Sequence, residues 1–223
     1  MFNTRVIFIV IFSFGFIVTY AQFGLRLKTN INKYSNINGY IQDSYEDNLK
    51  FHPRSYEVGL DYWFRLKKRR VEFLPEFSVS LSKSETNLDP SFNSKMVVYG
   101  FGFHTQIYAL DMEGDCNCPT FSKQGPSINK GLFFHFTPKV ALLSEKTSIL
   151  SEDQTQQKWI LGAGVGLGLD VGVSDLLTIT PILTYALFSS YESNVAPGVT
   201  DNPSQIQLSL RFGFRPDYNH RRR

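Results

Sequence analysis

The sequence has few cysteines, no strong excess of one charge and no long apolar run in its main part. Cysteine occurs only twice in 223 residues, which excludes a small secreted fold held together by many disulfides. The 23 basic residues nearly balance the 20 acidic ones, so the composition predicts no nucleic-acid surface. Beyond residue 21, no segment approaches the roughly 18 continuous apolar residues that indicate a transmembrane helix.

The two cysteines, Cys116 and Cys118, are separated by one residue in "GDCNCP". A structural zinc ion takes four ligands, and no second Cys or His pair lies nearby in the sequence. The pattern therefore favours a local disulfide, or two thiols in a turn, over a metal site.

The chain begins "MFNTRVIFIVIFSFGFIVTYAQF", with one basic residue, an apolar run from Val6 to Val18 and then small residues at Thr19 and Ala21. This order predicts a secretory signal peptide over residues 1–21 that is cleaved before Gln22. The alternative is an uncleaved membrane anchor, but a run of about 13 residues is shorter than the ~20 that span a bilayer.

What the remaining chain does have is alternation of apolar and polar residues with a period of two, which indicates strands. Eight such segments are predicted, at 22–33, 51–66, 71–83, 96–110, 131–143, 158–173, 177–188 and 205–215. Most connections alternate between short turns and long polar loops, with 111–130 as a long exception on the short side. This arrangement predicts an all-β fold over residues 22–216, an eight-stranded antiparallel up-and-down transmembrane β-barrel, followed by a basic tail at 217–223.

The polar face of these strands carries charge, whereas the other face carries Phe, Leu, Val and Tyr. The charged residues are Arg26, Lys28, Glu57, Asp61, Arg65, Glu72, Glu76, Lys139, Asp170 and Arg211. Such charges can lie inside a barrel only if they pair or meet water, and the apolar face is then free to contact lipid. We therefore expect the chain to lie in the bacterial outer membrane.

Two histidines, His104 and His135, fall on the inward face of adjacent strands. They either belong to the general polar network of the interior or pair with Asp170 or Glu76 in a protonation-sensitive group. On the outward face, three strands each carry a proline, at Pro75, Pro138 and Pro181. Proline lacks the backbone N–H, so we predict that each lies at a bulge or at the lower membrane boundary, where a ladder partner is missing.

The last strand, "QIQLSLRFGF", has Gln207, Ser209, Phe212 and Phe214 in a spacing that resembles the terminal signal read by barrel-assembly machinery. Together with "YAQ" at the end of the signal peptide, "DCNCPTFSKQG" before "KGLFFHFTPKV" and the closing "LRFGFRPDY", the chain resembles small outer-membrane β-barrel proteins of the Bacteroidetes, of the OmpA/OmpX type. The resemblance covers the whole chain after the signal peptide and implies an eight-stranded barrel. Most members of this group have no defined function, and some of this size serve type IX secretion.

No pattern in the sequence indicates a catalytic site. The run "GAGVGLG" lacks the strand, phosphate-holding turn and helix of a nucleotide site and fits small residues in a crowded barrel interior. The nucleophile pattern G-x-S-x-G is absent, and His52, at the extracellular rim, is the one histidine that could take an outward position. We predict no enzymatic activity, no cofactor, and no catalytic, cofactor-binding or metal-binding residues.

Two function classes remain open. In the first, a barrel with a side-chain-filled interior has a structural or partner-binding role through its extracellular loops; in the second, it is a transport or secretion component, either a narrow channel or a barrel associated with type IX secretion. An eight-stranded barrel has an interior that side chains just fill, which favours the first class. The loop at 34–50 carries Tyr34, Tyr40 and Tyr45, which either contact a partner or anchor at the membrane surface. The expected partners are outer-membrane lipid, the barrel-assembly machinery during biogenesis and other envelope proteins, with no nucleic acid.

Overall fold

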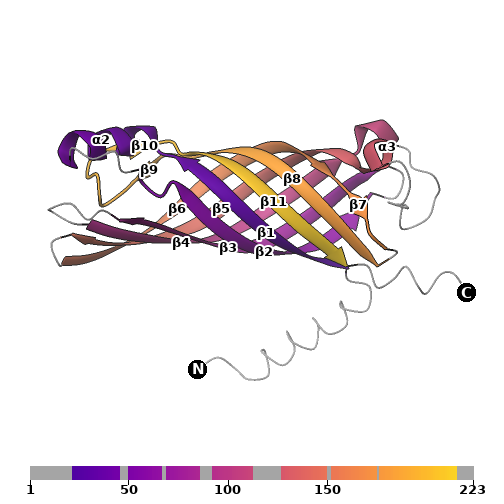
Figure 1. Ribbon diagram of the computed structural model, residues 1–223, viewed down its shortest axis with the longest axis horizontal. Helices are drawn as coiled ribbons and strands as arrows, with labels where there is room; N and C mark the ends of the chain where they lie inside the picture. The colour runs from indigo at the N-terminus through magenta and orange to yellow at the C-terminus, as the bar shows by residue number, and fades with distance from the viewer. Residues whose placement is uncertain are drawn as a thin grey trace, which may run out of the picture.

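The computed structural model describes residues 22–45, 50–66, 69–85, 92–112, 127–149, 152–174 and 176–214. Eight long strands in these ranges form one closed antiparallel barrel (Figure 1). They are β1 (Gln22–Lys33), β2 (Arg54–Arg65), β3 (Val71–Glu85), β4 (Phe92–Ile107), β5 (Leu132–Ile149), β6 (Glu152–Leu169), β8 (Leu177–Phe188) and β11 (Ser204–Phe214). Each strand pairs with its neighbour in sequence, and β11 pairs with both β8 and β1, which closes the barrel. The predicted fold is confirmed.

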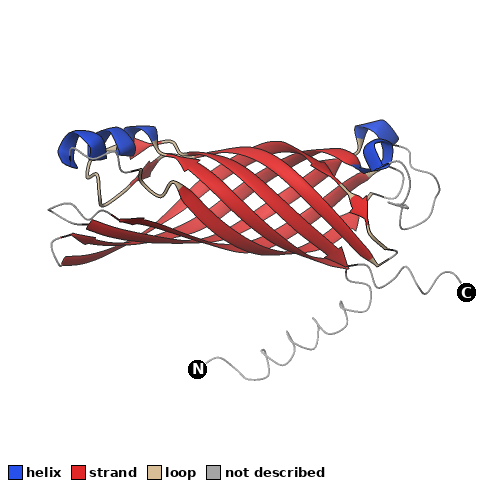
Figure 2. Ribbon diagram, viewed as in Figure 1, coloured by secondary structure: helices blue, strands red, loops and turns tan. Residues whose placement is uncertain are grey.

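Shorter elements gather at the two ends of the barrel (Figure 2). They are α2 (Ser35–Tyr45), the 3-10 turn η2 (Ala109–Asp111), α3 (Ser127–Gly131), β7 (Val171–Gly172), β9 (Tyr191–Glu192) and β10 (Thr200–Asp201). None of the helices in the described ranges is long and apolar enough to cross a membrane. Outer-membrane barrels keep short turns on the periplasmic side, so the end with α2, β9 and β10 faces outward from the cell.

The barrel is inside-out compared with a soluble protein. Along β1 from Gln22 to Ile31, buried and exposed residues alternate strictly, and the exposed ones are mainly Phe, Leu and Ile. On β3, the Phe77 side chain is 71% exposed, whereas the adjacent Glu76 is 1% exposed. An apolar surface of this extent needs lipid around it, and a closed barrel leaves no strand edge unpaired inside the lipid. The chain is therefore an outer-membrane β-barrel.

The three prolines interrupt the barrel ladder in the same way. Each lacks its pair with the preceding strand and keeps its pair with the following one. The kept pairs are Pro75 with Phe103, Pro138 with Ala163 and Pro181 with Leu210. The gap at Pro75 lies between the pairs Asp61–Glu76 and Phe64–Phe73. The gap at Pro138 lies between Gly102–Lys139 and Thr105–Phe136, and the gap at Pro181 lies between Gly168–Ile182 and Val171–Ile179.

The missing ladder partner is therefore confirmed, and of the two predicted positions, a bulge or the lower membrane boundary, the bulge is excluded. A bulge adds one residue to one strand, whereas the register is the same on both sides of all three gaps. Proline removes only one donor, so a local break in the pairing is sufficient and no extra residue is required.

We expect Pro138→Ala to change the free energy of unfolding by less than about 1 kcal/mol. The pair with the preceding strand is already absent, and alanine adds only the modest unfolded-state entropy that proline had removed. Urea unfolding of the barrel in lipid vesicles measures this change. A loss of several kcal/mol would show instead that the proline ring itself holds the wall in shape.

The extracellular strands are longer than the sequence indicated. Residues 144–157 were expected to form a polar loop, but β5 and β6 continue in one register out to the Ile149–Glu152 pair. The apolar–polar alternation ends there because neither face contacts lipid, while backbone pairing does not depend on side-chain polarity. As a result, the hairpins of β3–β4 and β5–β6 extend beyond the rest of the barrel (Figure 1). The predicted signal peptide, Cys116, Cys118 and the basic tail lie outside the described residues.

Candidate functional site: the filled interior and its two closures

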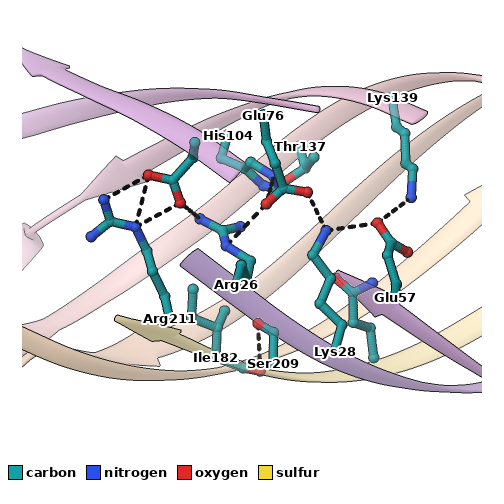
Figure 3. Close-up of polar contacts among 12 residues, drawn as sticks. Arg26, Lys28, Glu57, Glu76, His104, Thr137, Lys139, Ile182, Ser209 and Arg211 are labelled. Carbon is teal, nitrogen blue, oxygen red and sulfur yellow. Dashed lines mark hydrogen bonds and ion pairs between the residues drawn. The ribbon is translucent and has the colours of Figure 1, made fainter. Parts of the chain in front are cut away.

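The interior of the barrel holds a chain of alternating positive and negative side chains (Figure 3). In order, they are Arg211, Asp61, Arg26, Glu76, Lys28, Glu57 and Lys139. They come from β1, β2, β3, β5 and β11, and all but Lys139 are almost fully buried. Because each charge has a neighbour of opposite sign, the low-dielectric interior can hold all seven.

Of these seven charged side chains, those nearer the periplasm are centred on two arginines. Two nitrogens of Arg211 donate to the Asp61 carboxylate: Nη2 lies 2.6 Å from Oδ1, and Nε lies 2.8 Å from Oδ2. Arg26 lies between two carboxylates, with its Nη2 3.5 Å from Asp61 Oδ2 and its Nε 3.1 Å from Glu76 Oε2. The two-nitrogen geometry is the arrangement in which arginine binds carboxylate most strongly.

The other half is centred on Glu57. Its Oε1 accepts hydrogen bonds from Lys28 Nζ and Lys139 Nζ, both at 2.8 Å. Lys28 also pairs with Glu76 and so joins the two halves. Glycine leaves the room that these side chains need, since a Cβ on Gly59 would lie 2.6 Å from Glu76 Cδ.

The two histidines form a branch of this network. His104 Nε2 lies 3.2 Å from Glu76 Oε2, and its Nδ1 lies 2.8 Å from Thr137 Oγ1 and 3.2 Å from His135 Nε2. Their place in the interior network and the partner Glu76 agree with the sequence-based expectation. Asp170, the other expected partner, is held instead by Tyr108 and Thr180 near the periplasmic end.

The glycine-rich run of β6 is strand from end to end, so it has none of the turn and helix of a phosphate site. Its glycines that face the interior make room for neighbours; a Cβ on Gly168 would collide with the Phe133 ring.

The periplasmic end is closed around Tyr108. Its hydroxyl lies 3.2 Å from Glu72 Oε2 and also contacts Asp170. The Arg70 guanidinium lies 4.3 Å from the centre of the Tyr108 ring and pairs with Asp111. Burial, and then the nearby Asp170 carboxylate, raises the pKa of the Tyr108 hydroxyl well above its ordinary value, so it stays a hydrogen-bond donor.

The extracellular end is closed by an apolar cluster between the barrel wall, α2 and the segment that follows β9. Its buried members are Tyr34, Ile37, Ile41, Phe51, Met96, Ala141, Leu143, Ile160, Tyr191, Val195 and Ala196. Asp201 fixes α2 in place, because its Oδ2 accepts from the first-turn amides of Asn36 at 2.8 Å and Ile37 at 3.1 Å. We call this closure, formed by α2 and residues 189–203, the cap.

Two expectations for this end are wrong. The loop at 34–50 contains a helix, and Tyr34 packs inward with its ring 5.1 Å from the Phe51 ring. His52 is fully buried, and its Nε2 lies 3.0 Å from Ser94 Oγ. Burial lowers the pKa of His52 to about 3, which keeps the ring neutral. The sequence could not show this, because the inward turn of the chain depends on how the cap packs.

A single buried carboxylate, Glu145, joins the cap to the wall. It accepts hydrogen bonds from Ser193 Oγ at 2.7 Å, Ser94 Oγ at 3.0 Å and Thr147 Oγ1 at 3.1 Å, and another from the Tyr191 hydroxyl. Sequence reasoning missed Glu145, because it lies in the segment 144–157 that was expected to form a polar loop.

The interior holds a cavity of about 50 Å³ under the cap and another of about 20 Å³ beside Lys28 and Glu76. These volumes suit a few water molecules rather than an aqueous pore. Within the described ranges, no group of three or more His, Cys, Asp and Glu side chains is arranged to hold a metal ion. Chemically, the arrangement is a closed and internally paired core.

No protein-family model matches this chain, and no curated protein sequence matches it. Similar solved structures include Neisserial surface protein A, NspA, at 13% identity, covering 86% of this chain and 96% of that one with a TM-score of 0.45. Ail, the attachment invasion locus protein of Yersinia pestis, has 12% identity, covers 88% and 99%, and has a TM-score of 0.44. A major outer membrane protein from Thermus thermophilus has 10% identity, covers 87% and 99%, and has a TM-score of 0.47. Because these identities and TM-scores are low, the assignment rests on the strand pairing and surface of this chain.

Proposed function

We propose that this chain is a non-conducting outer-membrane barrel whose extracellular sheet binds another protein of the cell envelope. This proposal is based on the open edge of β6. Its ladder with β8 ends at the Gly162–Phe188 pair, whereas β6 itself extends out to Glu152. In the described part of the chain, residues 152–161 therefore have no strand partner on that side.

The direction of the backbone groups supports an open edge. Ser189 N donates to Leu161 O at 2.7 Å, and Leu161 N donates to Ser189 Oγ at 3.1 Å, so the Leu161 groups point away from β5. This direction alternates along a strand, and Thr155 and Gln157 therefore present their N–H and C=O groups to the same open side. An edge of this kind is a template for a strand from another protein.

The filled interior supports the non-conducting part of the proposal, which assigns the chain no enzymatic activity and no cofactor. Its other proposed partners are outer-membrane lipid and, during biogenesis, the barrel-assembly machinery. We also propose an origin in the Bacteroidetes, on the resemblance given above; its "DCNCPTF" segment lies outside the described residues.

We expect a photo-crosslinking amino acid at Gln154, which is exposed on β6, to capture one envelope protein in living cells. The same probe at Leu167, which faces lipid, should not capture it. The double variant Thr155→Pro/Gln157→Pro removes two donors from the open edge but none from the ladder with β5, and should abolish capture.

The matched control is Thr155→Ala/Gln157→Ala, which removes the same side chains but keeps both N–H groups and should preserve capture. Equal capture by the proline and alanine variants would contradict strand addition. If no protein is captured while the purified barrel conducts ions, the alternative role in transport or secretion replaces this proposal.

A further inference from the structure

The outer surface of the barrel changes from apolar to basic where the lipid-facing band ends on the extracellular side. Along β1 to β5, the outward face carries no charge until one basic residue is reached on each strand. These residues, which we call the basic collar, are Lys33, Arg54, Lys83, Lys95 and Lys146, and all five are exposed. Five neighbouring strands thus place the same sign of charge at the same boundary.

The register brings three of these side chains into one row. Lys83 pairs with Lys95, and Lys95 pairs with Lys146. Ser55 pairs with Ser82, which places Arg54 next to Lys83 on the neighbouring strand. Strands lie about 4.8 Å apart, and like charges directly opposite one another destabilise a sheet. The row therefore concentrates positive charge on the outer surface of the barrel, where an anion can contact several ammonium groups at once.

The position of the row identifies the kind of anion. Tyr99 lies on β4, four residues closer to the membrane than Lys95. It pairs with Leu142 on β5, which in turn pairs with Trp159 on β6. Tyr99 is 53% exposed and Trp159 is 71% exposed, which is typical of the aromatic belt at a membrane surface. The lysines thus lie just beyond that belt, and their flexible stems can reach the layer of lipid headgroups.

We propose that the basic collar binds the phosphate-bearing headgroups of anionic lipids in the outer leaflet. A lysine ammonium has three donors, and clustered basic residues next to a membrane attract anionic lipid. Lys83 and Lys146 also have interactions within the chain, but three donors leave room for a phosphate oxygen.

The apolar band below the collar favours a lipid over a soluble anion. Tyr99 and Trp159 are both exposed on this band, so a lipid whose acyl chains lie against the band brings its headgroup directly to the lysines.

The chain contains its own reporter for this test. Trp159 lies on the lipid face next to the collar strands, whereas the only other tryptophan, Trp63, is buried and donates to Glu72 Oε2 at 2.5 Å. Lipids with brominated acyl chains quench tryptophan on contact. The full chain is reconstituted in phosphatidylcholine vesicles that contain a small fraction of brominated phosphatidic acid or, for comparison, the same fraction of brominated phosphatidylcholine.

We expect the apparent affinity of the Trp159 site for brominated phosphatidic acid to exceed that for brominated phosphatidylcholine at least about fivefold. This is the factor by which one basic residue near an anionic membrane surface strengthens binding. Lys83→Gln/Lys95→Gln/Lys146→Gln should remove this preference. The control Lys67→Gln/Lys68→Gln/Arg69→Gln removes three positive charges from the connection between β2 and β3 and should keep it.

Equal affinity for the two lipids in the unmodified protein would overturn the proposal, as would a preference that survives in the collar variant. In a further experiment, inorganic phosphate is added as a competitor of the lipid. If it abolishes the preference at a concentration equal to that of the lipid, the collar is a site for soluble phosphate and the lipid assignment is wrong. Barrel folding in every variant is verified by gel migration before and after heating.

Discussion

Glu76→Ala is expected to lower the free energy of unfolding by about 3–5 kcal/mol, the usual loss when one partner of a buried ion pair is removed. Glu76 is 1% exposed and contacts Arg26, Lys28 and His104. Without it, Arg26 keeps only the longer contact with Asp61, at 3.5 Å. A loss of this size is large against a typical total stability of about 5–15 kcal/mol. Urea unfolding in lipid vesicles, followed by tryptophan fluorescence, measures it.

A double variant tests the reason for this loss. Arg26→Met/Glu76→Met removes one positive and one negative charge, so the net charge of the interior stays the same. The ion pair of Arg211 with Asp61 remains, and Glu57 keeps both Lys28 and Lys139 as partners. Because buried pairs can be replaced by apolar side chains at little cost, this variant should be more stable than Glu76→Ala. If both variants lose the same stability, packing around position 76 is responsible rather than charge. Glu192→Ala removes a half-exposed carboxylate that pairs with Lys158 and accepts from Gly198 N; it serves as the control and should cost far less stability than Glu76→Ala.

Glu145→Ala is expected to open the cap. The variant leaves the hydroxyls of Ser94, Thr147, Tyr191 and Ser193 without their shared acceptor. Unsatisfied buried hydroxyls cost about 1–3 kcal/mol each, and even about 2 kcal/mol would raise the open fraction roughly 30-fold. Limited proteolysis of the segment 189–203 and amide exchange of α2 measure this opening.

Glu145→Gln keeps one acceptor oxygen and should give an intermediate opening rate. The strands below the cap should keep their slow exchange in both variants, because the charged chain from Arg211 to Lys139 does not involve Glu145. Unchanged proteolysis in Glu145→Ala would show that the apolar cluster alone holds the cap.

The sequence predicted the parts of the fold that depend on the period of two. Glu57, Asp61 and Glu76 alternate with apolar neighbours, so the sequence alone placed them inside and Phe77 outside, as observed. It could not show which cation meets which carboxylate. That depends on the register between strands, which brings Arg211 of the last strand to Asp61 of the second.

The extracellular side was harder to predict for a different reason. Residues 144–157 are mostly polar, so their sequence resembles a loop although their backbone continues the ladder. Likewise, α2 has only a weak amphipathic pattern, and Ile37 and Ile41 are buried because the cap folds over the barrel end. Glu145 stands out only once Tyr191 and Ser193, nearly fifty residues later in the chain, are seen to lie against it.

The barrel spans the membrane with a filled interior, which is closed by the cap at one end and by Arg70 and Tyr108 at the other. Planar-bilayer recording of the purified, folded protein shows whether ions can pass through this interior. We predict no stable conductance, because the charged side chains and both closures fill the described part of the interior, in which the cavities beside them measure about 50 Å³ and about 20 Å³. Reproducible, long-lived openings of nanosiemens size would show instead that the interior is an open channel.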